Sequence, residues 1–120
     1  MIKFYKCSKC ENIIFKIKEK NDKYCCCDSL MQEVPLIYEE NEKHSPVVIF
    51  NNDLMSISVG SVTHPMSMDH LIEWIFIEYS NGGEFIYLSG EPFVSINIFG
   101  KTVKNIYSYC NLHGLYIREL

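Results

Sequence analysis

Side chains that can bind a metal ion gather in three short motifs from residue 42 onwards. All four histidines of the chain and one of its six cysteines lie in these motifs. Four neutral imidazoles and one thiolate form a nitrogen-rich set with one soft sulfur, which suits a redox-active iron better than calcium or magnesium. We therefore expect one metal site built from Glu42-Lys43-His44-Ser45-Pro46-Val47, His64-Pro65-Met66-Ser67-Met68-Asp69-His70 and Cys110-Asn111-Leu112-His113-Gly114.

A second group of cysteines lies near the N-terminus. Cys7 and Cys10 form a CxxC motif, and Cys25, Cys26 and Cys27 follow it. In a secreted chain such cysteines would suggest disulfides, whereas in a reducing compartment the CxxC spacing favours a metal. Four thiolates in a tetrahedron suit iron or zinc about equally. Strand alternation would point Cys25 and Cys27 the same way, so the residues alone leave the second pair open.

The elements that must position these ligands are predicted to be β-strands. Residues 55–59 and 94–98 alternate with period two, and residues 71–79 are apolar enough to be buried on much of both faces. Turn residues at 81–83 predict a hairpin into residues 84–88. Strands at this spacing are typical of a β-sandwich. Further strands are expected at 13–18, 47–50 and 101–109.

The residues between the expected ligands, and the spacing of those ligands, indicate how the ligands converge. Pro65 blocks regular structure between His64 and His70, which favours a loop at the end of the sandwich. Cys110 and His113 are three positions apart, so both can reach one ion around a tight turn.

Composition limits the class of protein. A chain of 120 residues is one ordinary domain, or a very small domain joined to a medium one. Residues 1–35 have too few apolar side chains for a core without a metal or a partner chain, and residues 35–41 are the expected linker. A net charge of -4 argues against nucleic acid as the partner. No signal peptide or membrane-length segment is apparent, so we expect a cytoplasmic protein.

These motifs resemble the catalytic domain of the superoxide reductases, over residues 42–120. The N-terminal CxxC with a distant adjacent pair resembles desulforedoxin. Together they resemble the desulfoferrodoxin family, the two-iron class of superoxide reductase. This implies a mostly β chain with a desulforedoxin-like four-cysteine domain at 1–36 and an immunoglobulin-like β-sandwich, the catalytic domain, at 37–120.

The resemblance implies an enzyme that reduces superoxide to hydrogen peroxide at a non-haem iron. Lys43 would attract superoxide and order a water that delivers a proton. Glu42 would close the sixth iron position after the product leaves, a position that is open in the ferrous state. The implied ligands are His44, His64, His70 and His113 in a plane, with Cys110 as the axial thiolate.

For the first site, the family pattern places a methionine four residues after the adjacent pair. Cys27 and Met31 fit this spacing, which leaves Cys25 as a spare thiol. Glu11 and Asp28 stand where the family commonly has glycine, a residue that relieves strain at positive φ. Asp tolerates that conformation better than Glu. The implied thiolates are Cys7, Cys10, Cys26 and Cys27, holding iron, with zinc as the alternative. The implied role of this site is structural, with electron relay as the alternative.

The resemblance also suggests partners. A rubredoxin-like carrier or a flavin reductase would supply electrons. Desulforedoxin-like units imply a homodimer. An enzyme that reduces superoxide is expected in an anaerobe or microaerophile. Two other readings stay open: a non-enzymatic electron carrier that uses the four-thiolate iron, and a zinc-stabilised structural module. A zinc hydrolase is disfavoured because four histidines and a thiolate overfill the usual catalytic zinc site.

Overall fold

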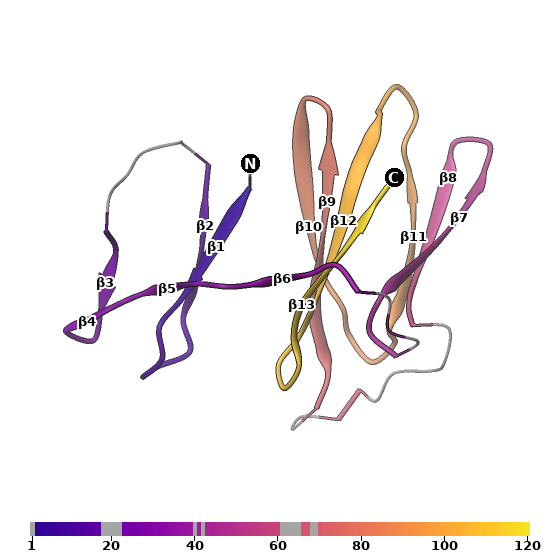
Figure 1. Ribbon diagram of the computed structural model, residues 1–120. Coiled ribbons are helices and arrows are strands. Elements are labelled where there is room, and N and C mark those ends of the chain that lie inside the picture. The colour runs from indigo at the N-terminus through magenta and orange to yellow at the C-terminus, as the bar shows by residue number, and fades with distance from the viewer. Residues whose placement is uncertain (1, 18–22, 40, 42, 61–65, 68–69) are drawn as a thin grey trace. The chain divides into compact units, whose positions relative to one another are not determined.

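A computed structural model of the chain describes residues 2–17, 23–39, 41, 43–60, 66–67 and 70–120 (Figure 1). Every regular element in these residues is a β-strand. The chain divides into two compact units, residues 1–35 and residues 36–120. Within the described residues, no helix is long and apolar enough to cross a membrane.

The N-terminal unit consists of short strands and two cysteine-bearing turns. These turns, one at Cys7 and Cys10 and one at Cys26 and Cys27, are called the knuckles. Phe4, Cys7 and Met31 are its most buried side chains, and the Phe4 and Phe15 rings pack with centroids 5.2 Å apart. The strand expected at 13–18 is confirmed but ends at Lys16. One sheet has the order β2-β1-β5 and a separate ribbon pairs β3 with β4, where the strands are β1 (Lys3–Lys6), β2 (Ile13–Lys16), β3 (Cys25–Cys26), β4 (Ser29–Leu30) and β5 (Gln32–Glu33).

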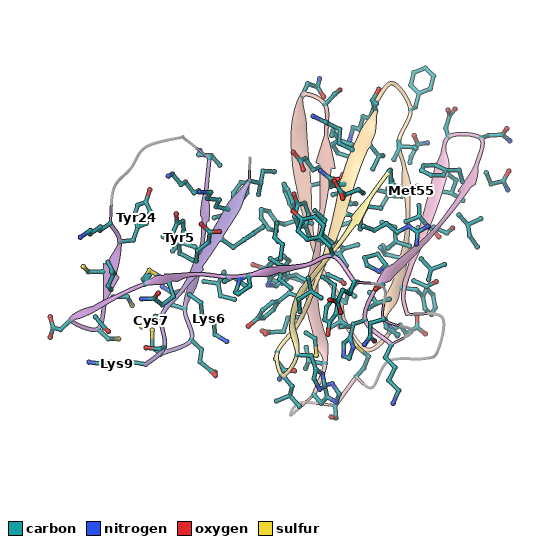
Figure 2. All side chains as sticks on the ribbon, viewed as in Figure 1. Tyr5, Lys6, Cys7, Lys9, Tyr24 and Met55 are labelled. Atoms are coloured by element: carbon teal, nitrogen blue, oxygen red, sulfur yellow. The ribbon has the colours of Figure 1, made fainter. Side chains whose placement is uncertain are left out.

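The C-terminal unit is a sandwich of two sheets (Figure 1). Its strands are β6 (Leu36–Ile37), β7 (Pro46–Asn51), β8 (Leu54–Val59), β9 (Ile72–Tyr79), β10 (Gly82–Tyr87), β11 (Phe93–Asn97), β12 (Val103–Cys110) and β13 (Gly114–Glu119). One sheet has the order β10-β9-β12-β13-β6 and the other β11-β8-β7. Met55 of β8, which Figure 2 labels, is fully buried in one cluster with Ile75 and Ile106 of the larger sheet. The predicted mostly β fold class is therefore confirmed.

The predicted strands of this unit are confirmed, with ends that differ by one or two residues. Part of the expected linker is a strand instead. Leu36 and Ile37 pair in parallel with Leu115 and Tyr116, because two adjacent apolar residues can complete the edge of the larger sheet. β13 is a further strand that was not predicted from the sequence.

Three chain segments meet at one end of this sandwich. Cys110, the last residue of β12, pairs with Ile72 at the start of β9. The turn before β7 is tied to the same region, because the Ser108 hydroxyl donates to the His44 carbonyl over 2.8 Å. The histidine and cysteine motifs thus reach one place from distant parts of the sequence.

Candidate metal centres

Four side chains of the described residues bring their donor atoms together at this end of the sandwich. His44, His70, Cys110 and His113 each offer one atom, and these atoms all lie within 4.8 Å of one another. His70 Nε2 is 3.2 Å from His113 Nδ1, and Cys110 Sγ is 3.5 Å from the same nitrogen. Two nitrogens bound to one ion at a right angle, with bonds of about 2.1 Å, lie about 3 Å apart. The spacing and the donor types therefore fit a shared metal ion.

Local contacts fix the turn that carries Cys110 and His113. The Asn111 amide N–H donates to the Leu71 carbonyl over 3.2 Å, and Asn111 Oδ1 accepts from the Leu71 amide over 3.0 Å. This pair of bonds holds the turn beside the segment that carries His70. Gly114 ends the turn at φ 106°, a conformation that favours glycine. Sequence analysis assigned no role to Asn111.

His44 is held on several sides. Its side chain is 5% exposed, and its ring stacks on Tyr116 with centroids 4.9 Å apart and planes 10° apart. Nδ1 lies 3.0 Å from Asn41 Oδ1, which leaves the buried Nε2 as the atom that can bind a metal. Tyr116 and Asn41 were not predicted from the sequence, since neither belongs to a motif.

Three further residues were predicted for this site, namely Lys43, Glu42 and His64. Lys43 precedes His44 in the turn before β7 and is exposed. Glu42 and His64 lie outside the described residues, so their roles stay predictions. Cys110 and His44 are buried, whereas His70 is half-buried and His113 exposed. The group thus has a protein-facing side and a solvent-facing side.

The second group lies in the N-terminal unit. Cys7, Cys10, Cys26 and Cys27 place their sulfurs within 4.8 Å of one another, and these are the four predicted cysteines. Cys26 Sγ is 3.5 Å from Cys10 Sγ and 3.9 Å from Cys27 Sγ. Sulfurs bound tetrahedrally at about 2.3 Å lie about 3.8 Å apart. The spacing therefore fits a four-thiolate metal, and exposed Cys25 is outside the group.

Electrostatics within this group favour a bound cation. The backbone N–H groups of Cys10 and Lys9 lower the pKa of Cys7 to about 6. Hydrogen bonds within the group, chiefly with Cys10, raise the pKa of Cys26 to about 12. Cys26 thus keeps its proton because the thiol donates to neighbouring sulfurs, and a metal ion bound by the four sulfurs would take the place of that proton.

The backbone of both knuckles is in the left-handed region. Glu11 has φ 64° and Asp28 has φ 56°, and these are the two positions where the resemblance implied glycine; Cys27 has φ 52°. Lys9, labelled with Cys7 in Figure 2, links the knuckles by donating from Nζ to the Cys27 carbonyl over 3.2 Å.

Comparison with known proteins supports a family assignment. The desulfoferrodoxin family model matches residues 37–119. A desulfoferrodoxin homolog of Archaeoglobus fulgidus is 33% identical over 122 residues, which cover 97% of this chain and 95% of that protein. A superoxide reductase of Pyrococcus horikoshii is 33% identical over 101 residues, which cover 68% of this chain and 88% of that protein. The crystal structure of the superoxide reductase from Treponema pallidum has a TM-score of 0.85 and 25% identity, covering 99% of this chain and 98% of that one. The chain therefore belongs to the desulfoferrodoxin family.

Proposed function

We propose that this protein is a superoxide reductase that converts superoxide to hydrogen peroxide. The observation that carries the proposal is the convergence of His44, His70, Cys110 and His113 on one point with a solvent-facing side. The relative from Pyrococcus horikoshii and the structure from Treponema pallidum are both named superoxide reductases, which supports the same activity.

The proposed centre holds iron, and the other cysteine group holds iron or zinc in a structural role. Ferrous iron bound there would supply the one electron that, with two protons, converts superoxide to hydrogen peroxide. An external donor, proposed to be a rubredoxin-like carrier or a flavin reductase, would supply the electron for the next turnover. The chain would act as a homodimer, with domains at 1–36 and 37–120. The proposed iron ligands are His44, His64, His70, His113 and Cys110.

The side chains around the centre have separate proposed tasks. Lys43, exposed beside His44, attracts the superoxide anion and orders the water that delivers a proton. Its attraction for a unit negative charge at contact distance is roughly 1–4 kcal/mol. Glu42 would be the side chain that binds the oxidised iron once the product has left. Buried Cys110 supplies an electron-rich thiolate on the protein side, which favours product release.

The test is to mix anaerobically reduced, iron-loaded protein with superoxide while recording the visible spectrum, peroxide and oxygen. We expect one peroxide for each superoxide and no oxygen. Zinc-loaded protein is the control, because zinc keeps the ligands in place but undergoes no redox change. No reaction at a fully ferrous centre would reject the enzyme and leave the electron carrier or structural module. Oxygen release would indicate dismutation instead.

A further inference from the structure

The turn before β7 is closed by reciprocal side-chain hydrogen bonds. Asn41 Oδ1 accepts the backbone N–H of Lys43 over 2.9 Å and that of His44 over 3.1 Å. In return, the Asn41 backbone N–H donates to Ser45 Oγ over 2.7 Å. This arrangement resembles a helix N-cap, in which a side-chain oxygen accepts the backbone N–H groups two and three residues further on. It fixes the backbone that carries Lys43 and His44.

The same oxygen also contacts the ring of His44. Nδ1 of His44 is 3.0 Å from Asn41 Oδ1. The two backbone N–H groups can only donate, so the atom facing them must be the amide oxygen and not the amide nitrogen. A carbonyl oxygen only accepts, so His44 Nδ1 must carry the proton. The lone pair is then on Nε2, the buried nitrogen.

We propose that Asn41 is a positioning residue for the iron centre: its side-chain oxygen fixes the Nδ1–H form of His44 and aims Nε2 at the metal, while it fixes the backbone of Lys43. Asn41 Oδ1 thus controls both the direction in which His44 Nε2 points and the position of Lys43, the residue proposed to attract superoxide. Partners of this kind orient histidine ligands, and their loss typically lowers metal affinity 10–100-fold. The stacking of His44 on Tyr116 and the hydrogen bond from Ser108 to the His44 carbonyl hold the residue but do not select the ring nitrogen.

The inference rests on the proposed iron site but does not need superoxide turnover. The experiment uses the full chain loaded with ferrous iron and compares wild type, Asn41→Ala and Asn41→Asp. The readouts are iron release to a chelator, the absorption spectrum of the oxidised centre and its midpoint potential. Cys110→Ser identifies the absorption that belongs to this centre, because it removes the sulfur donor of this group and leaves the four-cysteine group intact.

Asn97→Ala is a matched control. Asn97 Oδ1 accepts the Phe99 backbone N–H over 2.8 Å, so this change also removes an asparagine-capped turn. Asn97 pairs with Leu54, whereas the His44 turn leads into Pro46, which pairs with Val59 at the other end of β8. Asn97→Ala therefore removes a comparable asparagine cap from a turn that lies away from the iron centre.

We expect Asn41→Ala to weaken iron binding about 10–100-fold and to shift the absorption and the potential. Asn41→Asp keeps the acceptor oxygen and should restore iron affinity and the absorption spectrum to near wild type. If Asn41→Ala resembles Asn97→Ala, with a lower melting temperature but unchanged affinity, absorption and potential, Asn41 only caps the turn and the proposal is wrong. If all forms bind iron with these differences but none reduces superoxide, the proposed function fails and this inference stands.

Discussion

His70 Nε2 and His113 Nδ1 lie 3.2 Å apart, although 43 positions separate the two residues in the chain. Each ring presents a different nitrogen to the same point, which Cys110 Sγ also approaches. Two imidazoles joined only by a hydrogen bond would stabilise the fold by about 1 kcal/mol. A shared metal ion would contribute far more, and that difference can be measured.

His113→Ala tests the shared ion. His113 is exposed, so an ordinary surface role predicts a change within about 0.5 kcal/mol in the metal-free protein. As a ligand, it is needed for metal-linked stability. We expect the rise in melting temperature on adding ferrous iron to be much smaller in His113→Ala than in wild type. An equal rise in both proteins would contradict a ligand role.

Lys43→Ala tests electrostatic attraction of the substrate. The backbone of Lys43 is held by Asn41 Oδ1, so truncating the side chain should leave the turn intact. We expect the second-order rate with superoxide to fall about tenfold and to depend less on salt. Lys104→Ala is the control, because it removes the same charge from an exposed residue in β12. Equal effects of both changes would mean that net charge alone matters.

Cys26→Ser and Cys25→Ser form a matched pair for the first centre. Cys26 Sγ contacts the sulfurs of Cys10 and Cys27, whereas Cys25 is exposed and outside the group. We expect Cys26→Ser to lose the metal of the four-cysteine group and Cys25→Ser to keep it. Metal analysis and visible absorption of both variants measure this. The opposite result would place Cys25 in the ligand set.

Glu11→Gly should stabilise the N-terminal unit. Glu11 has φ 64°, a conformation that costs about 1–2 kcal/mol for a residue with a Cβ. Glycine adopts it readily but has more freedom when unfolded, so we expect a net gain of about 1 kcal/mol. The measurement is the denaturant midpoint for loss of the four-thiolate absorption. Glu91→Gly serves as the control, because Glu91 is exposed and is not among the residues with positive φ. An equal gain in stability in Glu91→Gly would mean that relief of backbone strain at Glu11 is not the cause.

The sequence predicts what is local or carried by motif, and misses what depends on pairing between distant segments. The Cys110–His113 turn follows from a short pattern, whereas the resemblance marked Glu11 only as a position where glycine is usual. By contrast, the contact between Ser108 and His44 spans 64 positions, and nothing in either neighbourhood signals it. The pairing of β6 with β13 is missed for the same reason, because two apolar residues in a presumed linker become a strand only when an edge is available.

Tyr107→Phe tests whether the phenol of Tyr107 makes the sandwich lose stability at high pH. Burial, followed by the hydrogen bond to the Glu78 carboxylate at 2.9 Å, raises the pKa of Tyr107. The fold thus favours the neutral phenol, so its contribution to stability is full below pH of about 10 and is lost as pH rises further.

We expect Tyr107→Phe to be less stable than wild type by about 1 kcal/mol near pH 8, because the hydrogen bond is lost. Between about pH 9 and 11 its free energy of unfolding should fall less steeply, because no buried phenol ionises on unfolding. Denaturant unfolding at several pH values, with the same metal loading, measures both effects. Tyr87→Phe, at a side chain that is 82% exposed, should follow the wild-type slope. Parallel slopes for Tyr107→Phe and wild type would show that Tyr107 does not set the alkaline limit.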